Sequence, residues 1–84
     1  MTTIPDELVE ALAADPAAAN LFTALHRHDR AAKCRWVRAG SRTEDRRRRA
    51  VQVLQDMRAH DATRRANLAR QVSALFSAAP SRNQ

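Results

Sequence analysis

Glycine, proline, cysteine and aromatic residues are scarce in this sequence. Its 84 residues include one glycine, three prolines and one cysteine, and aromatic residues make up 4%. A β-sheet needs many tight turns, which glycine and proline commonly form, so their scarcity argues against a sheet. The lone cysteine, Cys34, excludes an internal disulfide and with it a disulfide-stapled secreted miniprotein.

Long apolar runs are also missing. Because no run of about 18 apolar residues occurs, we expect no membrane-spanning helix. The first ten residues carry acids and no base, whereas a secretory signal starts with positive charge. These features predict a cytoplasmic protein.

Charge is divided unevenly along the chain. Residues 1–25 contain four acids and no base, and residues 26–84 contain fifteen bases and five acids. Balances of −4 and +10 therefore account for the net charge of +6. All the bases except Lys33 are arginines, whose planar guanidinium groups suit carboxylates and phosphates.

The residues that are abundant predict an all-α fold, a small bundle of four to five short helices in a single domain over residues 1–79. Alanine, arginine, leucine and glutamine favour helix, and the length fits one domain. Pro5 and Asp15 mark the starts of the first two helices, 5–13 and 17–25. Asp29 is expected to cap a third helix over 30–39, which Gly40 ends in the left-handed conformation.

The second half of the chain predicts one or two further helices. Thr43 is the expected cap of the fourth, and we expect a break near His60, with Asp61 capping a fifth. Since no proline or glycine interrupts this region, one continuous helix is the alternative. The additional C-terminal helix is assigned to 61–79 and a disordered tail to 80–84. An apolar stripe at helical spacing runs along the last helix: Leu68, Val72, Leu75 and Phe76.

Candidate site residues have two interpretations each. Trp36 is either a core anchor or a ring that faces a ligand, and the run of arginines at 46–49 is either a solvated helix surface or part of a binding edge. Cys34 is expected to be structural and buried. The scattered histidines do not form paired ligand spacings with it, so we expect no metal site and no cofactor.

Two segments near the start of the chain follow a known pattern: the Ile-Pro-Asp-Glu-Leu opening and the Ala-Leu-Ala-Ala-Asp-Pro-Ala-Ala segment. The pattern continues through these residues: Leu25, Arg30, Trp36, Val37, Arg42, Glu44, Arg46, Arg48, Arg49, Val53 and Leu54. With these motifs, residues 4–58 resemble the helical C-terminal region of the YdeI/OmpD-associated, or bacteriocin-protection, family. The resemblance implies a bacterial protein linked to envelope stress, or to protection against peptides and antibiotics, with a binding role and no enzymatic activity.

Three functional hypotheses follow. The first is a binding module for an acidic or amphipathic partner (a peptide, a protein or a small molecule), whose predicted site comprises Trp36, Arg35, Arg42, Arg46, Arg48 and Arg49. The second is a DNA- or RNA-binding module whose arginines, with Arg64, Arg65 and Arg70, contact phosphates. The third is a homo-oligomeric or protein-interaction module that uses the apolar stripe of the last helix.

Overall fold

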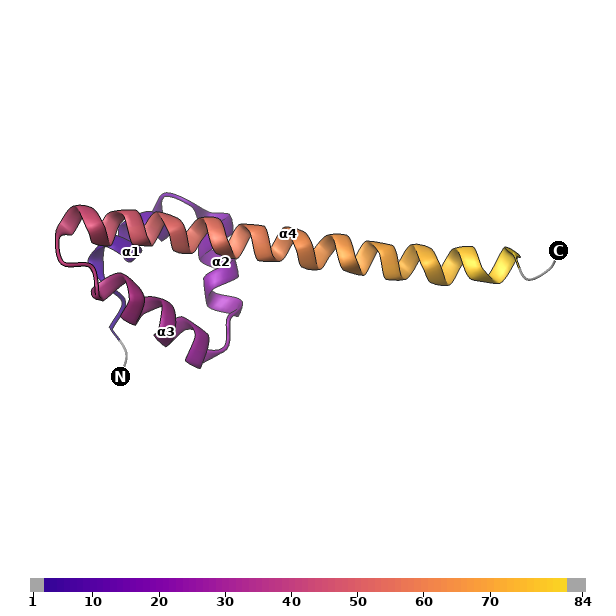
Figure 1. The fold of residues 1–84 in the computed structure, drawn as a ribbon, viewed down its shortest axis with the longest axis horizontal. Coiled ribbons are helices and arrows are strands. Elements are labelled where there is room, and N and C mark those ends of the chain that lie inside the picture. Colours follow the sequence, from indigo (N-terminus) through magenta and orange to yellow (C-terminus); the bar gives the residue numbers. More distant parts are fainter. Residues whose placement is uncertain (1–2, 82–84) are drawn as a thin grey trace.

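Four helices make up the described part of the protein. The computed structural model describes the backbone of residues 3–81 and the side chains of residues 3–76. The helices are α1 (Asp6–Ala13), α2 (Pro16–Ala24), α3 (Arg27–Arg38) and α4 (Thr43–Ser81). Figure 1 shows the three short helices packed against the first part of α4, which then projects alone. The all-α prediction is confirmed, since the described residues contain no strand.

The first two helices begin where the sequence signals predict. Pro5 precedes α1, and Asp6 and Glu7 occupy its first turn, where acids stabilise the positive end of the helix dipole. Asp15 caps α2: its carboxylate accepts a hydrogen bond from the backbone N–H of Ala18 at 3.2 Å.

The start of α3 corrects the prediction that Asp29 is its cap. The helix begins at Arg27, and the imidazole of His26 accepts a hydrogen bond from the backbone N–H of His28 at 3.1 Å. Asp29 lies inside the first turn. An acid there is stabilised by the helix dipole without capping the helix, so an aspartate near a helix start need not be its cap.

The turn between α3 and α4 also differs from the expectation. Within the described residues no glycine has a positive φ, so Gly40 does not end α3 in the left-handed conformation. A side chain at this position would instead collide with α4, because an ideal Cβ on Gly40 would lie 2.8 Å from Cγ and 2.9 Å from the backbone nitrogen of Arg46. Thr43 is the first helical residue and not the cap, and its hydroxyl accepts a hydrogen bond from Arg46 at 3.2 Å.

The expected break near His60 is wrong, because α4 is one continuous helix of 39 residues. Asp61 does not cap a new helix. Its carboxylate oxygens lie 3.0 Å from a guanidinium nitrogen of Arg64 and 2.9 Å from one of Arg65. Such pairs three and four residues apart belong to a helix interior. The helix also passes Pro80 and ends at Ser81, two residues beyond the expected end; the rest of the predicted tail lies outside the described residues.

The core is small and belongs to the first 57 residues. Each short helix contributes one or two side chains to the core, and the buried core residues are Leu8, Ala18, Phe22, Cys34, Val37, Ala50, Val53, Leu54 and Met57. Val51 is apolar but 49% exposed, because the inward face of α4 carries Ala50 and Val53 instead.

The rest of α4 makes the molecule elongated. It measures 64 × 24 × 20 Å and has a radius of gyration of 18.0 Å. A compact domain of this length would have a radius of gyration of about 12 Å. The protein therefore consists of a helical head, residues 3–61, and a projecting rod, residues 62–81, as Figure 1 shows.

Candidate functional site

Trp36 is at the surface, near the C-terminal end of α3. Its residue area is 44% exposed, so its interpretation as a core anchor is wrong. The inward face of α3 carries Cys34 and Val37, which are 1% and 0% exposed. A residue next to Val37 along a helix points about 100° away from it, which turns the indole outward.

Arg49 of α4 covers the exposed indole. Its guanidinium carbon lies 5.1 Å from the ring centroid of Trp36, and one guanidinium nitrogen donates a hydrogen bond to the Trp36 carbonyl oxygen at 2.8 Å. Contact between a cation and an aromatic face is attractive at this distance. The structure thus brings together two members of the predicted site and holds them in a defined geometry.

Two other predicted arginines are occupied within the chain. Arg46 donates from Nε to the carboxylate of Glu7 at 3.1 Å and from Nη1 to the carbonyl oxygen of Gly40 at 3.2 Å. Arg48 lies 3.4 Å from the carboxylate of Asp45, one turn away on an exposed face. Arg46 therefore ties α1 to the start of α4, and Arg48 belongs to the solvated surface of α4.

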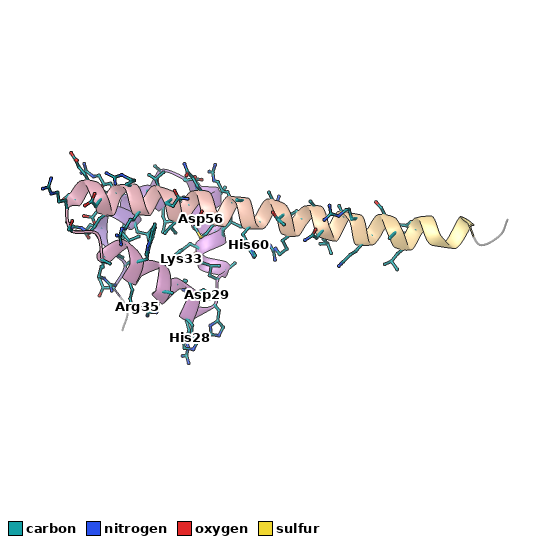
Figure 2. All side chains as sticks on the ribbon, viewed as in Figure 1. His28, Asp29, Lys33, Arg35, Asp56 and His60 are labelled. Atoms are coloured by element: carbon teal, nitrogen blue, oxygen red, sulfur yellow. The ribbon has the colours of Figure 1, made fainter. Side chains whose placement is uncertain are left out.

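The two remaining predicted arginines, Arg35 and Arg42, are exposed. Among the described residues neither side chain has a hydrogen bond or an ion pair. Figure 2 shows Lys33 on the side of α3 toward α4 and Arg35 on the opposite side. Two residues along a helix differ by about 200° in direction, which accounts for this arrangement. Arg35 is thereby separated from the Trp36–Arg49 contact.

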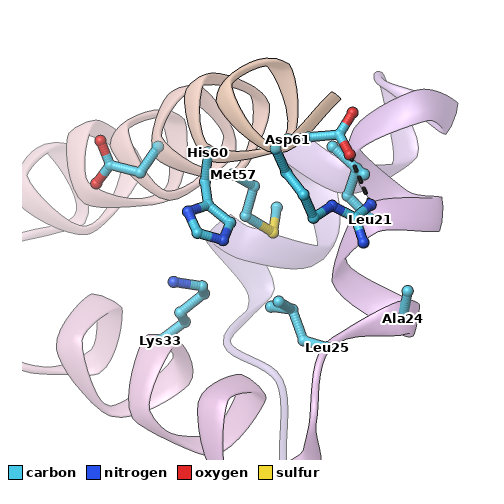
Figure 3. Close-up of a pocket in the computed structure, with 9 residues that line it drawn as sticks. Leu21, Ala24, Leu25, Lys33, Met57, His60 and Asp61 are labelled. Carbon is cyan, nitrogen blue, oxygen red and sulfur yellow. Dashed lines mark hydrogen bonds and ion pairs between the residues drawn. The ribbon is translucent and has the colours of Figure 1, made fainter. Parts of the chain in front are cut away.

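A pocket of about 210 Å³ lies where α2, α3 and α4 meet. Leu21, Leu25 and Met57 supply its apolar walls. Figure 3 shows Lys33 from α3 and His60 from α4 pointing toward one another across it. Its remaining lining residues are Ala24, Asp56, Asp61 and Arg64. The pocket therefore combines an apolar interior with a charged rim.

The pocket and the Trp36–Arg49 contact lie along the same edge of the α3–α4 interface. On α4, Arg49, Asp56 and His60 are separated by seven and four residues, which places them on one edge of the helix. On α3, Lys33 and Trp36 are three residues apart and share a flank. We call these five residues the α3–α4 groove. Figure 2 shows Lys33, Asp56 and His60 together where α3 faces α4.

The site predicted from the sequence does not include the pocket residues. In the sequence, Lys33 stands out only as the single lysine, and His60 only as one of the scattered histidines. The helical spacing of Lys33 with Trp36, and of His60 with Arg49, was the available signal. This spacing places each pair on one helix face, but the sequence does not show which flank of α3 faces α4.

Internal ion pairs join the acidic and basic parts of the chain. Besides Glu7 with Arg46, the carboxylate of Asp15 pairs with the guanidinium of Arg58. Backbone and Arg46 hydrogen bonds lower the pKa of Glu7, and those from Arg58 and the Ala18 N–H lower the pKa of Asp15. The acids of α1 and of the α2 cap thus hold the short helices to α4.

The nucleic-acid hypothesis relies on the arginines of the predicted site and on Arg64, Arg65 and Arg70. These two sets do not form one surface. Arg49 and Arg64 lie on the same straight helix, fifteen residues and therefore about 22 Å apart. Arg64 and Arg65 are both paired with Asp61. The basic residues are spread along α4 rather than gathered on one face.

Cys34 is buried, as expected, and desolvation raises the pKa of its thiol. In the part of the chain that the structure describes, no three His, Cys, Asp or Glu side chains are grouped as metal ligands. Nor does any helix there have the length and apolar character that crossing a membrane requires.

Comparison with known proteins identifies one family. No curated protein and no solved structure shows significant similarity to the chain. Residues 1–60 match the family described as bacteriocin-protection, YdeI or OmpD-associated. The match covers the head and leaves the rod outside, in agreement with the resemblance over residues 4–58. Because it spans well over half of the 84 residues, the chain belongs to the bacteriocin-protection, YdeI or OmpD-associated family.

Proposed function

We propose that this protein is a non-enzymatic, cytoplasmic binding module that acts in bacterial stress response or in protection against antimicrobial peptides and antibiotics. It captures an amphipathic partner in the α3–α4 groove. The family description, which names bacteriocin protection, supports the physiological setting. The observation that carries the binding role is the half-exposed Trp36, held beneath Arg49 on the same α3–α4 edge as an apolar pocket.

The groove fits a ligand that has both an apolar and an acidic part. The walls formed by Leu21, Leu25 and Met57 can take an aliphatic or aromatic side chain. Lys33 lies at the rim, where its ammonium group can pair with a carboxylate. The volume of about 210 Å³ suits one side chain of a peptide better than a whole drug-sized molecule. An amphipathic peptide is therefore the preferred ligand.

The chemistry of Cys34 supports a role without catalysis. A reactive cysteine needs an exposed thiolate in an electropositive environment. Cys34 is 1% exposed and its pKa is raised by burial, which keeps the thiol protonated and out of contact with ligands.

Tryptophan fluorescence tests this proposal, because Trp36 is the only tryptophan. The protein is titrated with a panel of antimicrobial peptides that carry both apolar and acidic residues. Binding in the groove is expected to shift the emission of Trp36 in a saturable way. Absence of any shift across the panel, confirmed by calorimetry, would refute groove binding.

A matched pair of variants localises the site. Lys33→Gln removes the rim cation and is expected to weaken peptide binding by about tenfold, the typical loss of one charge-assisted contact. Arg35→Gln removes the same charge two residues away, on the opposite side of α3, and should leave binding unchanged. Equal losses in both variants would indicate a diffuse charge effect and contradict the groove.

The nucleic-acid hypothesis stays a prediction with less support, since the arginines are spread along α4 and several are paired internally. A mobility-shift assay on random DNA decides it. Phosphate contacts would produce binding at low salt that weakens steeply as salt rises.

A further inference from the structure

The rod exposes an apolar stripe that nothing in the molecule covers. Leu68 is 59% exposed, Val72 42%, and Leu75 and Phe76 74% each. Every side chain of the rod that the structure describes, from residue 62 to residue 76, is exposed. The stripe lies beyond the head and outside the family match, so the groove does not account for it.

We propose that this stripe is a dimerisation surface on which a second copy of the chain packs in the antiparallel direction. Leu68, Val72 and Leu75 follow one another at intervals of four and three residues. This is the spacing of core positions in a coiled coil, with Leu68 and Leu75 at d and Val72 at a. Arg65 falls on the preceding a position, so the heptad pattern continues toward the head with a charged residue where the stripe has apolar ones.

Over the described part of the rod, residues 62–81, the charge distribution favours the antiparallel arrangement. The sequence from residue 71 to residue 81 contains no charged residue, whereas Arg64, Arg65 and Arg70 lie on the preceding part of the rod. A parallel pair would place each Arg65 against its own copy across the seam. An antiparallel pair that sets Val72 against Leu75 separates the two Arg65 residues by about 25 Å along the axis, several Debye lengths at physiological salt.

The sizes of the flanking residues fit the same arrangement. Ala69 and Phe76 both lie at e positions, and e positions face one another in an antiparallel pair. In the overlap that sets Val72 against Leu75, the phenyl ring of Phe76 lies beside Ala69 of the second copy. A large residue therefore meets a small one on both sides of the twofold axis.

The available area predicts a weak, reversible dimer. The exposed parts of the four apolar side chains amount to roughly 400–500 Å², below the ~800 Å² per partner of a standard stable interface. Neighbouring alanine, serine and glutamine residues add to this contact. We expect a dissociation constant on the order of 1–100 μM.

Sedimentation velocity on the full chain, from about 5 to 500 μM, tests the association, since this range brackets the expected dissociation constant. The wild type is expected to shift from monomer to dimer, and Leu75→Glu to remain monomeric throughout. Val51→Glu is the matched control, because Val51 is an exposed apolar residue of the same helix but lies within the head. A wild type that stays monomeric at the highest concentration would overturn the proposal and leave the stripe to a different protein. Equal behaviour of the two glutamate variants would also overturn it.

Spin labels at two positions test the direction. Thr63→Cys and Arg70→Cys, each in a Cys34→Ala background checked by circular dichroism, both place a label on the outer f face of the rod. An antiparallel dimer separates the two labels by about 31 Å along the axis at position 63 and about 10 Å at position 70. Equal distances at the two positions would show a parallel dimer and contradict the proposal. Failure here leaves the groove hypothesis untouched, because the groove lies wholly within the head.

Discussion

At the scale of the residue, Arg46 shows that an arginine-rich sequence does not by itself identify which arginines are available for binding. Its sequence context, four arginines in a row, predicts a binding edge, yet its guanidinium contacts Glu7, Gly40 and Thr43. Arg49, three residues later, instead covers the exposed Trp36. The two side chains are chemically identical, so only the packing of α1 and α3 against α4 distinguishes a structural arginine from one at a candidate site.

Gly40 is the residue whose replacement should be most informative. In Gly40→Ala the new methyl group would lie under 3 Å from both Cγ and the backbone nitrogen of Arg46, so the turn has to move. We expect a loss of about 1–3 kcal/mol in the free energy of unfolding, the usual cost of overpacking. Thermal or urea unfolding followed by circular dichroism measures it. Ala39→Ser, at the exposed neighbouring position, should cost less than about 0.5 kcal/mol; equal stabilities for the two variants would contradict the close approach.

The lowered pKa of Glu7 predicts a pH dependence of stability. Because its pKa is lower in the folded than in the unfolded protein, the ionised side chain stabilises the fold. This contribution is complete above the ordinary glutamate pKa of about 4.3 and is lost as the pH falls through the lower, folded value. We expect the melting temperature to fall on acidification below about pH 4.5.

Two glutamine variants separate this effect from general acid sensitivity. Glu7→Gln should melt at a lower temperature near pH 7 and lose less stability than the wild type as the pH falls to 3. Glu10→Gln, on the same helix and exposed, should resemble the wild type at each pH. If Glu7→Gln keeps the full pH dependence, the pair with Arg46 does not contribute to it.

At the scale of the element, local signals predicted the helices well and their boundaries unevenly. Asp15 caps α2 as expected, whereas Asp29 and Asp61 lie within helices. An aspartate can accept an N–H bond at a helix start or pair with an arginine one turn away. The aspartate is a cap only if the residues before it are not helical. The aspartate itself does not indicate whether they are.

Truncation tests the division of α4 into head and rod. Every buried residue that the structure describes lies at or before Met57. A chain ending at residue 61 should therefore keep the cooperative unfolding and the melting temperature of the wild type to within a few degrees, while losing the helical signal of about 20 residues. A chain ending at residue 52 loses Val53, Leu54 and Met57 and should not fold. If the chain that ends at residue 61 did not fold, the rod would be shown to stabilise the head.

At the scale of the whole molecule, the fold class was predictable and the shape was not. Helical spacing and the lack of turn residues specify an all-α chain. The same spacing at Leu68 and Leu75 also predicts an amphipathic helix, but not whether its apolar face meets the head. That depends on the direction of α4 after His60, where no glycine or proline occurs before Pro80 to turn the chain back.

Small-angle scattering checks the elongated shape. The Leu75→Glu variant keeps the measurement on the monomer. Its radius of gyration should be near 18 Å, as in the structure, and far from the value of about 12 Å for a compact chain of this length. A value near 12 Å would mean that the rod folds back on the head and covers its own stripe.

The straight rod also makes the molecule a spacer. In the antiparallel pair each head lies at an opposite end, and the two His60 residues are about 40 Å apart along the axis. The two grooves then cannot share one short peptide, but both can engage ligands fixed to a common surface or repeated along one chain. Avidity from such bivalent contact would raise the apparent affinity by orders of magnitude without any new interaction in either groove. The length of α4 thereby sets the spacing of targets that the protein would hold most tightly.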